Sequence, residues 1–215
     1  MLAIRTAMAS AVVISTAAAC VPGATGAFMS PPTVRASDIA PGAPKRERRM
    51  GDNIFLRTAP YGAELLTFGG NIHIRQAEGF VAASTFGGGI DIDSLIAGGR
   101  LVAHGGDVRL QLAPSASQRD LDITVRGGDV RLELPKNASA TIQIRQTYGR
   151  DHDRMSRSRI ESSIPLKKSE PSPWKREAKH GFRYRQRVDA TGSVGGGRDR
   201  ITIQVDDGSV ILTGR

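Results

Sequence analysis

A short unit recurs along this chain, and it constrains the fold more than any other feature. Five anchors each pair a glycine-containing turn with a branched aliphatic residue: Gly69–Ile72, Gly87–Ile90, Gly105–Val108, Gly127–Val130 and, after a long gap, Asp207–Val210. The first four anchors follow one another at intervals of 18, 18 and 22 residues. Apolar and polar residues alternate on both sides of each anchor, and this period of two predicts a strand, a turn and a second strand.

Units that repeat at a fixed spacing bury their apolar sides best when each one stacks on the last. We therefore expect an all-β fold, a short single-stranded β-solenoid of about five to six rungs, rather than an antiparallel hairpin array. Equivalent residues of successive rungs would then form columns. The two inward columns would be Ile72, Ile90, Val108, Val130 and Val210, and Ile74, Ile92, Leu110, Leu132 and Leu212.

Glycines mark the corners of the expected rungs. A tight corner requires positive φ angles or a close approach of two backbones, and a Cβ atom opposes both. We therefore assign a structural turn role to nine glycines: Gly69, Gly70, Gly87, Gly88, Gly105, Gly106, Gly127, Gly128 and Gly208.

Opposite charges mostly lie one rung apart in the outward columns, which favours a structural role for their charged residues. One column would hold His73, Asp91, Arg109 and Arg131, and the next Arg75, Asp93, Gln111 and Glu133. Opposite charges on neighbouring strands stabilise a sheet, whereas a catalytic pair needs burial or like-charge crowding. The consecutive residues Asp151, His152 and Asp153 cannot all face one ion. We therefore predict no catalytic residue, no metal ligand and no cofactor.

The N-terminus indicates export. Residues 7–19 form an apolar stretch too short to span a membrane, and we interpret residues 1–20 as a signal peptide. The single cysteine, Cys20, follows directly and resembles the lipidated cysteine of the bacterial lipobox, although Ala17 replaces the larger aliphatic residue usual there. Cleavage after Ala19 or a later alanine is the alternative. We expect a protein of the periplasm, or an outer-membrane-anchored lipoprotein held by the lipid on Cys20.

Residues 21–50 are rich in proline and lack apolar periodicity, so we expect them to form a disordered tether. The β-solenoid domain would then cover residues 51–215. The formal net charge of +9 comes mainly from two segments, the tether of residues 21–50 with +3 and residues 148–187 with +7. Residues 148–187 carry twelve basic and five acidic side chains and lack the repeat, so we expect an irregular basic insertion there, before the last rung.

Alternation near the end of this insertion would place Arg183, Arg185 and Arg187 on one face of a strand, with Phe182, Tyr184 and Val188 on the other. One hypothesis is a contact surface for anionic lipid, lipopolysaccharide or another envelope polyanion, to which Lys167, Lys168, Lys175 and Arg176 would add charge. The alternative is a solvated loop that covers the edge of the solenoid. Nucleic acid is not expected as a partner, since an exported chain meets little of it.

The anchors GGNI, GGGI, GGDV, GGDV and DGSV, together with the segment Leu134–Ile144, resemble the adhesin-like family of bacterial proteins, a domain of unknown function with Gly-Gly-Asp-Val-type β-solenoid repeats. The resemblance covers residues 51–215. It implies a β-solenoid in an exported or envelope-associated protein and supplies no catalytic residues.

Three hypotheses for the function follow. The first is a non-enzymatic envelope protein, adhesin-like or a scaffold, that presents its basic surface to anionic envelope components or to a protein partner. The second is a structural solenoid that self-assembles end to end, as bactofilins do. The third is a β-helical carbohydrate-active enzyme, for which Asp206 and Asp207 are the one adjacent acidic pair.

Overall fold

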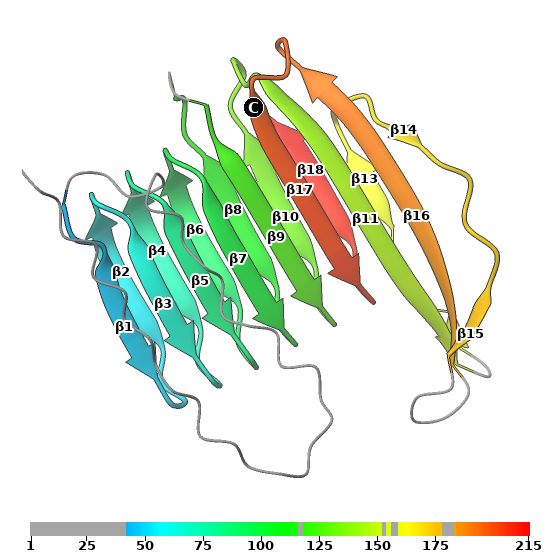
Figure 1. Cartoon of the computed structure of the whole chain (residues 1–215), viewed down its shortest axis with the longest axis horizontal. Coiled ribbons are helices and arrows are strands. Elements are labelled where there is room, and N and C mark those ends of the chain that lie inside the picture. Colours follow the sequence, from blue (N-terminus) through cyan, green and yellow to red (C-terminus); the bar gives the residue numbers. More distant parts are fainter. Residues whose placement is uncertain (1–41, 116–117, 152–153, 156–158, 178–182) are drawn as a thin grey trace, which may run out of the picture. The chain divides into compact units, whose positions relative to one another are not determined.

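The computed structural model describes residues 42–115, 118–151, 154–155, 159–177 and 183–215. Within these ranges the chain is all-β, and no helix there is long and apolar enough to cross a membrane. The expected signal peptide, Cys20 and residues 21–41 of the expected tether lie outside the described residues. The strands form two sheets of mostly parallel strands (Figure 1).

The first sheet has the order β1-β3-β5-β7-β9-β17-β11-β16-β14, with β12 beside β11 and β15 beside β16. Its strands are β1 (Lys45–Arg49), β3 (Ala63–Thr67), β5 (Val81–Thr85), β7 (Gly99–His104), β9 (Asp120–Arg126), β11 (Ala140–Asp151), β12 (Arg154–Met155), β14 (Lys167–Lys168), β15 (Lys175–Glu177), β16 (Arg183–Val194) and β17 (Asp199–Asp206). The second sheet has the order β13-β18-β10-β8-β6-β4-β2. Its strands are β2 (Ile54–Ala59), β4 (Ile72–Ala77), β6 (Ile90–Leu95), β8 (Val108–Leu112), β10 (Val130–Leu134), β13 (Ile160–Ser162) and β18 (Val210–Gly214).

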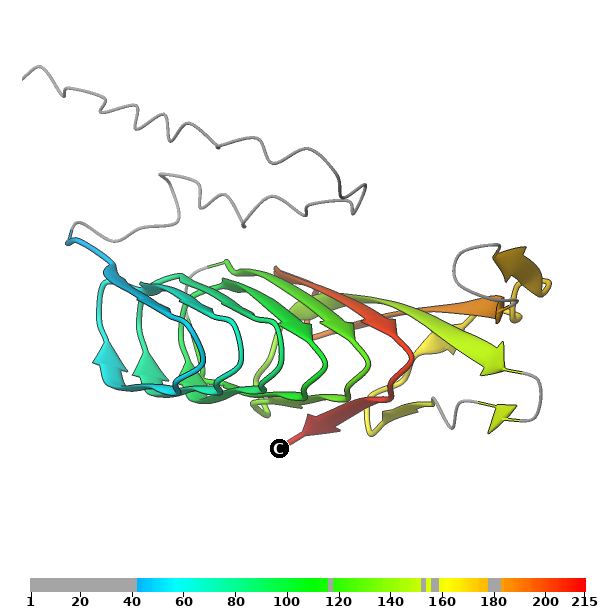
Figure 2. The same cartoon turned by 90° about the horizontal axis from the view of Figure 1, so that it is seen from below.

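Consecutive strands from β1 to β10 alternate between the two sheets, so each coil of the chain contributes one strand to each sheet. Figure 2 shows these coils following one another in a β-helix-like arrangement. Parallel neighbours in the first sheet are 18 residues apart at its start, as in the pairs Lys45–Ala63 and Ala63–Val81. The repeat in the sequence is therefore the length of one coil.

The repeat begins earlier than we expected. Residues 45–49, which we assigned to the tether, form β1 and pair with β3. Ile54 likewise pairs with Ile72, so the segment Gly51–Ile54 is a degraded anchor at the usual distance of 18 residues. The domain boundary expected at residue 51 is therefore wrong, because parallel pairing can extend to a highly charged strand at a sheet edge.

Both predicted inward columns are confirmed. Their ten residues are in register across β4, β6, β8, β10 and β18, and each has an exposed fraction of at most 2 %. They face a matching column of the first sheet that contains Leu65, Ala83, Leu101, Ile123 and Ile203. The hydrophobic core thus lies between the two sheets and runs from coil to coil.

The second glycine of each pair has the stricter steric requirement, because a Cβ atom there would overlap the neighbouring coil. A Cβ atom on Gly88 would lie 2.1 Å from the carbonyl oxygen of Gly70, and one on Gly106 would lie 2.3 Å from that of Gly88. The same holds for Gly128, where the distance to the carbonyl oxygen of Gly106 is 2.3 Å. The requirement at the second position is therefore close backbone approach between coils.

The residue after each glycine pair explains why the anchors contain asparagine or aspartate. The Oδ1 atom of Asn71 accepts a hydrogen bond from the backbone N–H of Gly89 at 2.7 Å. Asp107 accepts one from the N–H of Asp129 at 2.9 Å, and Asp129 accepts one from that of Ser209 at 2.7 Å. Each such side chain satisfies a backbone donor of the next coil, which aligns the corners.

The segment between residues 148 and 187 is more regular than we expected. Tyr148 lies within β11, which pairs antiparallel with β16, and the short strands β14 and β15 pair antiparallel with β16. Strand β13 extends the second sheet parallel to β18. Short strands therefore pair in parts of the segment that we expected to be irregular, because antiparallel pairing needs only alternation and no glycine anchor.

Strand β17 lies between β9 and β11, although it follows both in sequence. A buried ion pair fastens its first residue. The Nη2 atom of Arg119 lies 2.6 Å from Oδ2 of Asp199, and its Nη1 atom donates to the carbonyl oxygen of Ala113 at 2.6 Å. Both side chains are buried, so the stability of the fold around β17 depends on this pair. Losing either partner would leave the other charge buried without a counter-charge.

Strand β1 closes the first coil with charged residues. Lys45, Glu47 and Arg49 are in register with the inward-facing Ala63, Leu65 and Thr67. The Nη2 atom of Arg49 lies 2.6 Å from Oε1 of Glu47. Inward-pointing charges on an edge strand oppose the addition of another strand, because the added coil would bury them.

We predict that Gly88→Ala destabilises the fold by roughly 1–3 kcal/mol, since its methyl group would overlap a carbonyl oxygen of the neighbouring coil. Gly87→Ala is the matched control, because the nearest atom to its new Cβ would be 3.6 Å away. Denaturant unfolding measures the difference. Equal losses in the two variants would contradict the close-approach explanation.

We also predict that replacing Lys45, Glu47 and Arg49 together with valine produces concentration-dependent polymers in light scattering. The control replaces Arg46 and Arg48 with valine, because these residues alternate with the inward-facing ones on the same strand. Polymers in the control, or none in the triple variant, would show that the inward charges of β1 do not prevent strand addition at this edge.

Candidate anion-binding surface

Most of the predicted basic residues gather at one edge of the first sheet. Strand β16 carries Arg183, Arg185 and Arg187, and its antiparallel neighbours β14 and β15 carry Lys167, Lys168, Lys175 and Arg176. These strands lie side by side at the right of Figure 1. Along β16, Val188 packs against the core and Arg187 is exposed, in agreement with the predicted alternation, whereas Tyr184 is 41 % exposed and the side chain of Arg185 only 25 %. Phe182 lies outside the described residues.

Register divides these cations between the two faces. Lys167 pairs with Thr191 and Lys175 with Arg185, so both lysines share the outer face of the sheet with Arg187. The neighbouring residues Lys168 and Arg176 belong to the other face, where the Nζ atom of Lys168 donates to the carbonyl oxygen of Ile160 at 2.7 Å. The seven residues therefore do not form one surface.

Two arginines share one carboxylate on the outer face. The Nε atom of Arg187 lies 3.1 Å from Oδ2 of Asp189, and that of Arg145 lies 3.3 Å from Oδ1 of the same residue. Both arginine side chains are more than half exposed, with relative areas of 53 % and 56 %. One carboxylate can balance one guanidinium, so this cluster of Arg145, Arg187 and Asp189 keeps a net positive charge.

Arg185 has a different role. Its Nη1 atom lies 3.9 Å from Oδ1 of Asp206, and its Nη2 atom lies 3.6 Å from Oδ2 of Asp207. Asp207 also accepts a hydrogen bond from the N–H of Gly149 at 2.7 Å, and Asp206 lies 3.8 Å from Nε of Arg126. This network joins β16 and β11 to the corner that follows β17. The acidic pair considered for carbohydrate chemistry is thus engaged by two arginines and a backbone amide.

His73, Asp91 and Asp93 lie close together on the outer face of the second sheet, with their ligand atoms within 4.8 Å of one another. Nδ1 of His73 lies 3.7 Å from Asp91, and Nε2 lies 3.6 Å from Asp93. The two nitrogens therefore face different carboxylates, which is the geometry of a charge ladder, because a single ion would bind one of the two nitrogens. Phe55 stacks on the imidazole at 5.1 Å.

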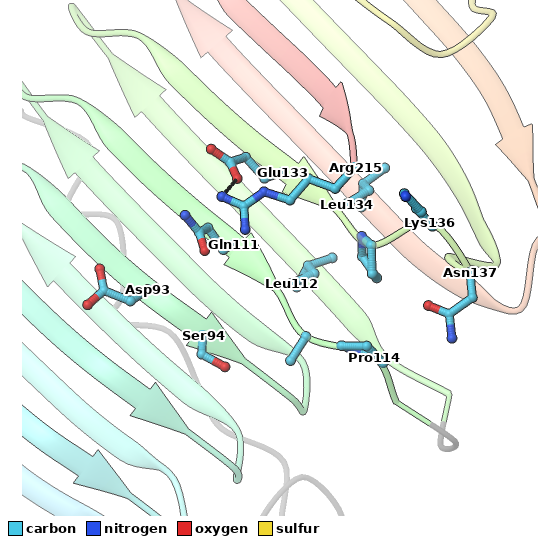
Figure 3. A pocket seen from close by; sticks show the side chains of 12 residues that line it. Asp93, Ser94, Gln111, Leu112, Pro114, Glu133, Leu134, Lys136, Asn137 and Arg215 are labelled. Carbon is cyan, nitrogen blue, oxygen red and sulfur yellow. Dashed lines mark ion pairs between the residues drawn. The ribbon is translucent and has the colours of Figure 1, made fainter.

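A hollow of about 420 Å³ lies beside this group on the same sheet (Figure 3). Its lining contains two carboxylates, those of Asp93 and Glu133. Asp93 contacts His73, and Oε2 of Glu133 lies 2.5 Å from Nη2 of Arg215, the ion pair drawn in Figure 3. Each of these two carboxylates therefore contacts a basic side chain.

Aromatic side chains form a stack at the corner where β3, β5 and β7 end. The ring centroids of Phe68 and Phe86 are 5.2 Å apart, and those of Phe86 and His104 are 5.1 Å apart. Arg48 covers the far side of Phe68, 5.7 Å from its centroid. Burial and, secondarily, the positive charge of Arg126 hold the pKa of His104 below its ordinary value of 6.5.

Comparison with known proteins returned no match to a family model, a curated protein or a solved structure. The function must therefore be inferred from the surface itself. Sequence reasoning missed Arg145 and Asp189, which are directly opposite each other on β11 and β16. Only their alternation with apolar neighbours marked them as outward-facing, and nothing in the sequence paired them across 44 residues.

We predict that Arg126→Gln raises the pKa of His104 towards 6.5 without restoring it, because burial remains. Proton NMR titration measures this pKa, and Arg131→Gln on the other sheet is the control. Because folding lowers this pKa, its contribution to stability is present above pH 6.5 and is lost as the pH falls through the folded-state value. An unchanged pKa in Arg126→Gln would exclude the charge effect.

Proposed function

We propose that this protein is a non-enzymatic, exported cell-envelope protein whose β-solenoid of about five to six rungs presents a basic surface to anionic envelope components. The proposal rests chiefly on one observation, the sharing of Asp189 by Arg145 and Arg187. The exposed Lys167 and Lys175 on adjacent strands add to the positive charge of this face. We call the surface formed by Arg145, Arg187, Lys167 and Lys175 the basic face.

Anionic head groups suit this face chemically. Guanidinium groups bind phosphate and carboxylate oxygens through paired N–H donors, and lysines add charge without fixed geometry. Arginines held on paired strands also lose less freedom on binding than arginines of a loop. Anionic lipid and lipopolysaccharide supply such groups at high density. An acidic protein partner is the alternative ligand.

Export is supported by the composition of residues 1–20 and by the position of Cys20, which would attach the chain to a membrane if lipidated. The resemblance of the anchors to the adhesin-like family agrees with an envelope setting. The charged inward positions of β1 oppose the self-assembling alternative. The pairing of Asp206 and Asp207 with Arg185 opposes the carbohydrate-active alternative.

The proposal predicts salt-sensitive co-sedimentation with anionic vesicles and with lipopolysaccharide. The double variant Lys167→Glu/Arg187→Glu should lower the affinity by more than about tenfold, since each basic residue near an anionic surface contributes ~1 kcal/mol. Raised salt should weaken wild-type binding, because the screening length falls to about 8 Å near 0.15 M.

Arg109→Glu/Arg131→Glu is the matched control, because it reverses two charges on the outer face of the other sheet. Equal loss in both double variants would show that net charge, rather than the basic face, determines binding. Absence of binding by the unmodified chain would remove the proposal, and capture by acidic proteins alone would replace it with the protein-partner alternative.

A further inference from the structure

One row of side chains crosses the outer face of the first sheet from its aromatic corner to the basic face. Register pairs His104 with Arg126, Arg126 with Asp206, Asp206 with Thr147, and Thr147 with Arg187. The ring stack continues the row on the other side of His104. The complete row is Phe68, Phe86, His104, Arg126, Asp206, Thr147 and Arg187.

The row begins just beyond the ends of β3 and β5 and continues across β7, β9, β17, β11 and β16, and these strands lie side by side in Figure 1. At about 4.8 Å per strand it is about 29 Å long. Its two halves differ in chemistry. The half on β3 to β7 is aromatic, and the half on β17 to β16 carries the arginine networks. Both halves face the same side of one sheet.

The aromatic half is exposed to solvent. Relative exposure is 38 % for Phe68 and 50 % for Phe86. Met50, which follows the residue paired with Thr67, is also exposed at the equivalent place one coil earlier. The outward-facing residues two positions before Phe68, Phe86 and His104 are Leu66, Ser84 and Val102. These three residues are uncharged, so few charges interrupt the aromatic half.

Ring geometry limits what this half can bind. Each phenylalanine has both faces covered, Phe68 by Arg48 and Phe86, and Phe86 by Phe68 and His104. Sugars and nucleobases stack on ring faces, and these faces are occupied. What remains are ring edges, which suit insertion among lipid head groups and the upper parts of acyl chains.

We infer that the outer face of the first sheet docks onto an anionic bilayer, with Phe68 and Phe86 entering the interfacial layer and the basic face contacting the head groups. The inference deepens the proposed function and rests on it. A soluble polyanion needs only the charges, whereas a bilayer uses both halves of the row. A membrane surface is therefore the ligand that this face fits best.

Fluorescence of a single tryptophan in the full chain tests the docking. In a Trp174→Phe background, Phe86→Trp places the probe in the row. Phe55→Trp is the matched control, because Phe55 is 60 % exposed and stacked on a histidine, but lies on the second sheet. The probes are vesicles of phosphatidylglycerol and phosphatidylcholine with brominated acyl chains, and soluble polyphosphate. Phe68→Trp repeats the measurement should Phe86→Trp not fold.

With vesicles, we expect the emission at position 86 to shift to shorter wavelength and to be quenched, and the emission at position 55 to stay unchanged. Adding Lys167→Glu/Arg187→Glu should abolish the quenching at position 86. Polyphosphate should bind without shifting the emission.

Vesicle and polyphosphate binding that is salt-sensitive, with no quenching at position 86 or equal quenching at both positions, would overturn the docking inference and leave the proposed function intact. Absence of salt-sensitive binding to either probe would overturn both.

Discussion

Adjacent coils of this protein approach so closely at one corner that a side chain has no room at the second position of each turn. Gly70, Gly88, Gly106, Gly128 and Gly208 each lie against a carbonyl group of the preceding coil. This contact sets the coil spacing, and the side-chain oxygen of the Asn or Asp that follows, where present, accepts a hydrogen bond from a backbone N–H of the next coil. The aliphatic columns then stack in register, because register errors at the corner would bury unpaired backbone groups. The flat outer rows of side chains, including the proposed docking row, follow from the same alignment.

Local repetition was enough to predict the all-β fold and the inward columns from the sequence. It failed where the repeat is degraded or replaced. Strand β1 was missed because Lys45–Arg49 reads as a charged linker, and Gly51–Ile54 preserves only part of an anchor. The position of β17 depends on contacts between distant segments, above all the ion pair of Arg119 with Asp199. No local pattern marks such a pair, since either residue alone is typical of an exposed loop.

The basic surface could be predicted in outline because alternation along a strand separates its two faces. Alternation placed Arg187 on the exposed side of β16 and Val188 towards the core, but it did not anticipate the exposure of Tyr184, and it does not say which charges are already paired. Arg185 is held by Asp206 and Asp207, whereas Arg187 shares its carboxylate with Arg145. A count of basic residues therefore overstates the charge presented to a ligand, and the pairing decides where the excess lies.

The place of β17 and β18 has a consequence for synthesis. Both strands follow their flanking strands in sequence, yet each fills an interior position, β17 between β9 and β11 and β18 between β10 and β13. When residues 42–194 have been made, the neighbours of β17 and β18 are present in both sheets, but these two strands are not. The first coils can close by pairing within short stretches of chain, but the later strands wait for residues 199–214. Contacts of such long sequence separation form slowly. Until they form, the facing edges of β9 and β11 and those of β10 and β13 are open to other strands, so this fold is exposed to mispairing until residues 199–214 have paired.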